Sequence, residues 1–131
     1  MAIKYQWRDI LLLQDAIGVS MTPPAAWTEI LSAFKGARAP FDPTAMRGEQ
    51  MRMVVTGALN LALAGAEFRL EDEDSTVWIT ATNFNYTTPT VVRSTWQTIP
   101  SISSEKELVP KFFGDNAKIF SIYAIRLQVR G

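Results

Sequence analysis

The chain has 131 residues, of which 47% are apolar and 20% charged, a composition typical of one globular domain that excludes wholesale disorder. Its 13 basic and 13 acidic side chains cancel, so it lacks the basic surplus typical of proteins that bind nucleic acids. Because the sequence contains neither histidine nor cysteine, it also excludes disulfides, thiol chemistry, ordinary zinc sites and the commonest acid–base catalysts.

Two helices are predicted in the N-terminal part of the chain. Residues 5–19 carry apolar side chains near helical spacing, and Gly18 fits the end of such a helix. Thr22 is a suitable N-cap, and Pro23 then falls in a first helical turn, where a missing N–H group costs nothing. The apolar residues that follow repeat at i, i+3, i+4 and i+7, as on one face of a helix: Trp27, Ile30, Leu31 and Phe34.

Residues 44–65 fit two different structures. Asp42 followed by Pro43 is a helix-start signal, and a helix from Thr44 to Ala64 is one interpretation. The apolar side chains also alternate as a strand requires, at Met51, Met53, Val55, Leu59, Leu61 and Leu63. The Ala and Leu content favours the helix, and the strand stays open as the alternative, since Gly57 suits neither element.

The chain from Ala66 onward is predicted to be β. Strands are expected around 67–71 and over 76–86, 91–99 and 119–129, with a short helical turn from Ser104 to Pro110. The whole chain, 1–131, is therefore expected to be a single α+β domain. In it, two or three N-terminal helices pack on one face of a roughly four-stranded antiparallel sheet. If residues 50–64 form a strand, the fold becomes mostly β.

Two of the predicted strands carry apolar side chains on both faces. In one, Trp78 lies opposite Val77 and Ile79, and in the other, Phe120 and Ile122 lie opposite residues 119, 123 and 125. A sheet with one packed face does not usually need apolar residues on its second face. We therefore expect that second face to be covered by another copy, by a partner protein or by this chain's own helices.

Five of the eight residues from 67 to 74 are acidic, which raises the question of a metal site. Calcium-binding loops carry carboxylates at alternating positions and a glycine where the loop turns sharply. The acidic segment has no glycine, and no further acid follows at the required spacing. We therefore predict that Asp72, Glu73 and Asp74 form a hairpin tip that holds no metal, and that their like charges discourage pairing with other sheets.

Aromatic and arginine side chains on neighbouring strands predict a binding surface. Such groups stack on planar rings, as in nucleotide or sugar sites, and Arg93, Arg126 and Arg130 are suited to a phosphate or carboxylate. The candidate ligand-binding residues are Trp78, Tyr86, Arg93, Trp96 and Arg126. The candidate interface residues are Asp72, Glu73, Asp74, Phe120 and Ile122. No catalytic residue or cofactor is predicted, because no phosphate-binding loop or catalytic motif occurs.

Three functions fit these observations. We favour a non-enzymatic structural or assembly subunit that self-associates, for which a phage capsid or tail is one setting. The alternatives are a small module that binds a nucleotide or sugar, and an inhibitor or immunity-type protein that acts through its acidic hairpin. The expected partner is a further copy or another protein. Nucleic acid is not expected, given the zero net charge, and a membrane is not expected because no apolar run reaches roughly 18–20 residues. Without a recognisable secretion signal, we expect a cytoplasmic or virion location.

Overall fold

The computed structural model describes residues 8–29, 38–43, 49–61, 66–115 and 117–131, which form ten β-strands and no α-helix. The strands are β1 (Arg8–Met21), β2 (Thr28–Glu29), β3 (Ala39–Phe41), β4 (Gln50–Leu59), β5 (Glu67–Asp72), β6 (Val77–Asn83), β7 (Thr90–Arg93), β8 (Gln97–Thr98), β9 (Lys106–Phe113) and β10 (Phe120–Arg130). No helix in this described part of the chain has the length and apolar character of a membrane span.

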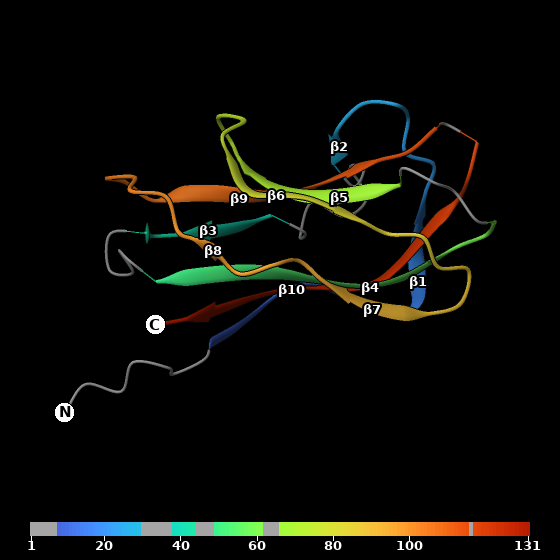
Figure 1. Cartoon of the computed structure of the whole chain (residues 1–131), viewed down its shortest axis with the longest axis horizontal. Helices are drawn as coiled ribbons and strands as arrows, with labels where there is room; N and C mark the ends of the chain where they lie inside the picture. Colours follow the sequence, from blue (N-terminus) through green and yellow to red (C-terminus); the bar gives the residue numbers. More distant parts are fainter. Residues whose placement is uncertain (1–7, 30–37, 44–48, 62–65, 116) are drawn as a thin grey trace.

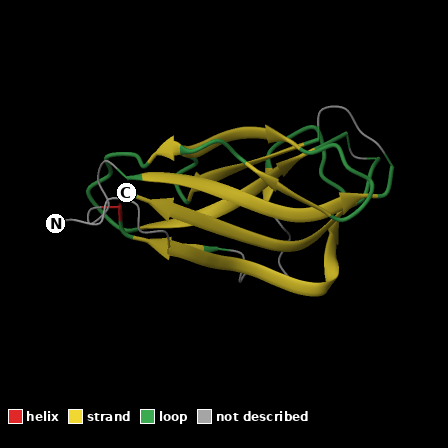
Figure 2. Ribbon diagram, turned by 60° about the horizontal axis from the view of Figure 1, so that its bottom comes forward, coloured by secondary structure: helices red, strands yellow, loops and turns green. Residues whose placement is uncertain are grey.

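The strands form two antiparallel sheets that face each other. Sheet A has the order β1-β10-β4-β7, and β8 also pairs with β4. Sheet B has the order β2-β9-β5-β6, and β3 also pairs with β9. Figure 1 shows the sheets as two layers, with sheet B above sheet A, and Figure 2 shows the strands running side by side along the long axis. Apolar side chains fill the space between the layers, so the fold is a β-sandwich.

The order in which the chain visits the two sheets is that of a jelly roll. β7 and β8 pair with successive parts of β4, and β2 and β3 pair with successive parts of β9, so each pair acts as one interrupted edge strand. Of the eight strand positions that result, the first pairs with the last, the second with the seventh, the third with the sixth and the fourth with the fifth. This nesting is a long antiparallel hairpin rolled into a sandwich, as in jelly-roll folds.

The predicted α+β fold is therefore wrong, and the alternative of a mostly β chain is correct. The first predicted helix is largely replaced by β1, and the described start of the second contains β2, while residues 30–37 lie outside the described part. Residues 50–59 of the ambiguous segment form β4, and residues 62–65 again lie outside it. The predicted helical turn before Pro110 is instead the beginning of β9.

Breaks in the pairing of β1 explain why it resembles a helix in the sequence. Its register with β10 shifts between Leu11 and Leu13 and again between Gln14 and Val19. A β-bulge inserts an unpaired residue and turns the following side chains to the other face, so strict alternation is lost. Gly18 lies in the second break with φ of 91°, a conformation that favours glycine. The apolar residues consequently fall at spacings close to those of a helix.

Bulges also account for the strands that looked apolar on both faces. In β10 the register shifts just after Ile122, and Phe120, Ile122 and Ile125 are all 0% exposed in the core. In β6 a similar shift leaves the adjacent residues Trp78 and Ile79 both buried. These apolar side chains belong to the core between the two sheets of the same chain. Val77 and Ile119, which were predicted to lie opposite them, are exposed instead, at 38% and 42%.

Gly57 of β4 marks a close approach of two strands in sheet A. A Cβ atom added at Gly57 would lie 2.6 Å from the backbone oxygen of Ser121 and 2.9 Å from the ring of Phe120. Because such distances are too short for non-bonded carbon atoms, only glycine fits there without rearrangement. Position 57 of β4 thus requires glycine, although glycine suits the interior of neither a helix nor a strand.

Candidate functional site

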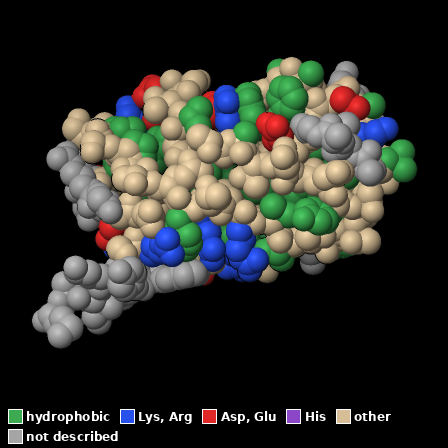
Figure 3. All heavy atoms as spheres, in the orientation of Figure 1, with side chains coloured by type: hydrophobic (Ala, Val, Ile, Leu, Met, Phe, Trp, Pro, Cys, Tyr) green, Lys and Arg blue, Asp and Glu red, His purple; other side chains and the backbone are tan. Residues whose placement is uncertain are grey.

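The outer side of sheet A carries a group of arginines. On β10, core residues alternate with outward residues, which are Arg126, Gln128 and Arg130. Register places Val54 of β4 between Arg126 and Arg93, and Arg52 beside Gln128, so these side chains share one face. Figure 3 shows Lys and Arg side chains gathered on the outer side of the lower layer. We call this surface the arginine face; it consists of Arg52, Arg93, Trp96, Arg126 and Arg130.

Trp96 is positioned on the arginine face by the interruption between β7 and β8. Ser94 donates its N–H to the oxygen of Met53 at 2.9 Å, and its Oγ accepts the Met53 N–H at 2.9 Å. The Trp96 ring then contacts Arg52 and Arg130, whose Cζ atoms lie 4.4 Å and 4.1 Å from the ring centroid. Two guanidinium groups therefore already engage the ring that we predicted as a stacking platform for a ligand.

Two glutamines accept hydrogen bonds from arginines of this surface. Arg52 Nε donates to Gln128 Oε1 at 2.7 Å, and Arg130 donates from Nε and Nη2 to Gln50 Oε1 at 3.0 Å and 2.8 Å. Within the described residues, Arg93, Arg126 and Arg130 form no ion pair. Glutamine orients a guanidinium group without cancelling its charge. Register also places Asp9 of β1 opposite Gln128, beside Arg52, and the four arginines outnumber this acid, so the arginine face remains positive.

The arginines also act on one another electrostatically. Partial burial lowers the pKa of Arg52 below its ordinary value, and the positive charges of Arg93 and Arg130 lower it further, while Asp9 acts in the opposite sense. Arginine stays charged at any physiological pH, so the consequence is a repulsive positive potential rather than a loss of charge. A carboxylate or phosphate placed on this face would relieve that repulsion.

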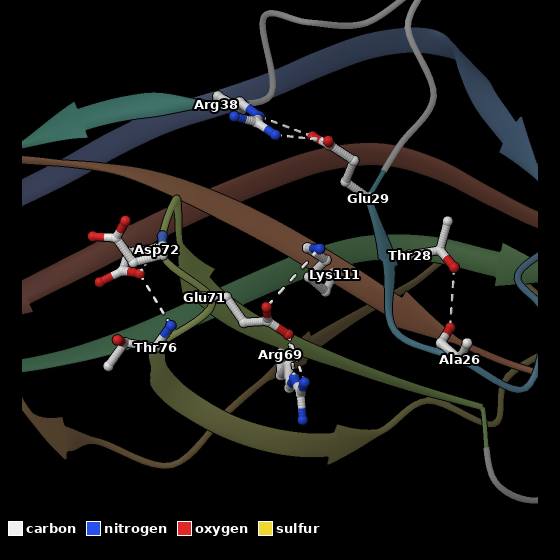
Figure 4. Close-up of polar contacts among 10 residues, drawn as sticks. Ala26, Thr28, Glu29, Arg38, Arg69, Glu71, Asp72, Thr76 and Lys111 are labelled. Carbon is white, nitrogen blue, oxygen red and sulfur yellow. Dashed lines mark hydrogen bonds and ion pairs between the residues drawn. The ribbon is translucent and has the colours of Figure 1, made fainter.

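The outer side of sheet B is different, because its basic side chains are paired with acids. Arg38 bridges Glu29 at 2.7 Å, and Arg69 bridges the buried carboxylate of Glu71 at 2.6 Å. Lys111 also approaches Glu71, at 3.9 Å, and Figure 4 shows these three pairs. Basic side chains are thus paired with acids on sheet B, whereas Arg93, Arg126 and Arg130 of the arginine face form no ion pair within the described residues.

The structure brings three of the five predicted ligand-binding residues together. Arg93, Trp96 and Arg126 all belong to the arginine face. Trp78 is instead buried between the sheets, with 3% of its surface exposed. Tyr86 is half exposed in the β6–β7 loop, where it packs edge-on against Phe84, and it lies apart from the other four.

The acidic hairpin tip is built around one buried carboxylate. Asp72 Oδ1 accepts the N–H groups of Asp74 at 2.8 Å and Thr76 at 3.0 Å, which closes the turn between β5 and β6; the second of these is drawn in Figure 4. Among the described residues there is no group of three or more acidic side chains placed to hold a metal ion. Asp72 is 3% exposed, whereas Glu73 and Asp74 are exposed, so only the latter two can reach a partner.

The other two candidate interface residues do not lie on the surface. Phe120 and Ile122 are both fully buried in the core between the sheets. Phe120 packs against Phe84 and Phe112, with ring centroids 4.6 Å and 5.3 Å apart. Their role in the described structure is to join the two sheets, and an interface role for them would require the sandwich to open.

Sequence reasoning missed Arg52 as a member of the arginine face. Its outward direction follows from the inward direction of Met51 and Met53, which are 1% and 0% exposed. Alternation in the strand interpretation of residues 50–64 was the available signal. The helix interpretation does not use this signal, because side chains in a helix repeat with a period of about 3.6 residues, and Arg52 is then not placed on one face with the arginines of β10.

The chain was compared with protein families, curated proteins and solved structures. Neither a protein-family model nor a curated protein matches the chain. Among solved structures, the chain is similar to dimeric latent PorU from Porphyromonas gingivalis, at 13% identity and a TM-score of 0.52, covering 98% of this chain and 13% of that one. It is also similar to a structure of infectious bursal disease virus, Gx strain, at 14% identity and a TM-score of 0.47, covering 97% of this chain and 32% of that one. The chain thus spans well under half of either protein.

Proposed function

We propose that this chain is a non-enzymatic structural subunit that associates with further copies of itself through the arginine face. The observation that carries the proposal is the positive charge of three exposed or half-exposed arginines without a described acidic partner: Arg93, Arg126 and Arg130. Arginine and tryptophan are enriched at the energetic centres of protein interfaces. Sheet edges and outer faces are the surfaces that a closed sandwich has available for such contacts.

The overall charge of the chain favours another copy over a foreign anion as the partner. The formal net charge is zero, so the positive charge of the arginine face is balanced by acidic surface elsewhere on the same molecule. Every copy therefore carries both members of a complementary pair of surfaces. The apolar residues that led us to expect self-association are buried within the chain, so charge rather than exposed apolar area supports the proposal.

A virion is one setting for such a subunit, and it stays part of the proposal. Jelly rolls occur in viral capsid proteins, in lectin domains and in cupins, so the architecture is compatible with a capsid or tail role. Because one fold serves many functions, this compatibility does not choose among them.

A small-anion site is the second candidate function. Arg93, Trp96 and Arg126 lie together, as a ligand site requires, and their charge suits a phosphate or carboxylate. A ligand present at 100 times its dissociation constant stabilises the folded state by roughly 2.7 kcal/mol. A panel of nucleotides and acidic sugars that leaves the melting temperature unchanged would therefore count against this candidate.

Light scattering coupled to size-exclusion chromatography tests the proposed function. We expect the native mass of the full chain to rise with protein concentration from one subunit toward two or more. A mass that stays at one subunit over the whole accessible concentration range would overturn self-association.

A further inference from the structure

We infer that the arginine face of one copy binds the acidic rim of the next, so that copies join head to tail. The acidic rim consists of Glu73, Asp74, Glu105 and Glu107, beside the turn that joins β5 to β6. This inference rests on the proposed self-association and specifies the surface that the arginine face meets.

The acidic rim is a defined structure rather than a loose group of acids. The N–H of Glu73 donates to the oxygen of Glu107 at 2.9 Å, and the N–H of Glu107 donates back to Glu73 Oε1 at 3.1 Å. Lys106 Nζ bonds Asp74 Oδ2 at 2.7 Å. These contacts fix the β5–β6 turn against the start of β9. Glu107 also pairs with Arg38 at 3.5 Å, and the side chains of Asp74 and Glu107 remain 60% and 43% exposed.

The charges that surround one basic group differ between the two surfaces. Hydrogen bonding to Asp74 and its charge raise the pKa of Lys106, with smaller contributions from Glu73 and Asp72. On the arginine face, the neighbouring arginines lower the pKa of Arg52 after burial has done so. The nearby charges are thus acidic at the rim and mostly basic at the face.

The two surfaces lie on opposite sides of the sandwich. The arginine face belongs to sheet A, and the acidic rim to sheet B, whose β5–β6 turn projects from the top of the view in Figure 1, away from β4 and β10. The acidic rim of one copy therefore cannot reach the arginine face of the same copy. A contact between two different surfaces is heterologous, and it leaves one free surface of each kind, so further copies can join in a ring or an open chain.

Local structure makes the arginine face suitable for carboxylates. Arg52 and Arg130 are held by the Trp96 ring and by glutamine side chains, so less side-chain freedom is lost when a partner binds. A guanidinium group can bond both oxygens of one carboxylate, a geometry that lysine cannot reproduce. The flanking Arg93 and Arg126 lie on either side of β4, so the face presents separate charges to separate carboxylates.

Two neutralised variants test the inference. The face variant carries Arg93→Gln and Arg126→Gln, and the rim variant carries Glu73→Gln and Asp74→Asn. Each variant alone should associate at least roughly tenfold more weakly than the wild type, because it has lost one of the two surfaces. An equal mixture should regain association and stop at two subunits, because the rim variant's intact face binds the face variant's intact rim.

The outcomes separate this inference from the proposed function. Association of the wild type with no change in the face variant overturns the inference alone. Weak variants whose mixture stays monomeric also overturn the head-to-tail pairing. A wild type that is monomeric, and that uses the face to bind a single-stranded oligonucleotide instead, overturns both. Circular dichroism and melting curves establish that each variant is folded. If a double variant does not fold, the single substitution Arg93→Gln or Asp74→Asn replaces it and is judged by the same criteria.

Discussion

Trp78 donates its indole N–H to the buried carboxylate of Asp72, with 3.1 Å between Nε1 and Oδ2. The same carboxylate closes the β5–β6 turn, so one side chain joins the acidic tip to the core. Phe41 of β3, at the other edge of sheet B, packs edge-on against Trp78, with ring centroids 5.6 Å apart. An acid that the sequence placed on the surface is therefore a structural element of sheet B.

Replacing Asp72 with Ala should destabilise the protein by about 2–3 kcal/mol, because three N–H donors lose a charged acceptor. Urea unfolding monitored by tryptophan fluorescence measures the change. Asp74→Ala is the matched control in the same turn, and its exposed ion pair with Lys106 should contribute much less to stability. Equal effects of the two substitutions would show that Asp72 has no special structural role.

Replacing Gly57 with Ala should cost about 1–3 kcal/mol, because the new methyl group meets the backbone oxygen of Ser121. The backbone cannot move aside as a flexible side chain would. Thr56→Ala, at the adjacent half-exposed position, should stay within about 0.5 kcal/mol of the wild type. A neutral Gly57→Ala would mean that β4 and β10 are farther apart than the structure shows.

Replacing Trp96 with Leu should cost about 1–2 kcal/mol through the loss of two cation–π contacts. It should also weaken self-association, because Arg52 and Arg130 are no longer held in place. Trp27→Leu is the control, since Trp27 makes a similar contact with Arg69 on sheet B, 4.2 Å from the ring. The control should lose stability while its association is unchanged, and a loss of association in both variants would argue against a specific role for Trp96.

The ion pair between Glu29 and Arg38 should make a small, pH-dependent contribution to stability. Hydrogen bonding to Arg38, and then its charge, lower the pKa of Glu29 below its ordinary value of 4.5, against the opposing effect of burial. Since the folded-state pKa is the lower one, the stabilisation is present above pH 4.5 and is lost as the pH falls through the folded-state value.

Both side chains are more than a third exposed, so solvent screening limits the contribution of this pair to about 1 kcal/mol. Thermal melts of the wild type and of Glu29→Gln between neutral pH and about pH 3 measure it, the ordinary pKa of a glutamate lying inside that range. The wild type should be the more stable at neutral pH, and the two curves should converge in acid. A difference that is constant with pH would contradict the assignment.

The sequence predicted the regular parts of this fold and failed at its irregular parts. The strand predicted at 119–129 matches β10 closely, and the acidic turn between two strands is confirmed, because alternation and turn chemistry are local signals. The helix expected at 5–19 is wrong because the bulges of β1 are set by pairing with β10, more than 100 residues away.

The prediction of a helical turn ending at Pro110 is wrong for a related reason, since the pairing around Pro110 is also set by distant strands. It lies within β9, opposite Leu70, in the short stretch between the parts of β9 that pair with β2 and β3. The described residues place no partner strand on that second side, so the missing N–H group costs no ladder bond there. The arginine face was likewise found only in part, because its members come from strands whose neighbours are distant in sequence.

The salt dependence of the native mass tests the account most directly. Raising the salt concentration from about 0.1 M to about 1 M shortens the screening length from about 10 Å to about 3 Å, which weakens contacts between charged surfaces. We predict that sedimentation velocity of the wild type will show assemblies at the lower salt concentration and single subunits at the higher one. A mass that does not change with salt, or one that increases, would contradict association through the arginine face.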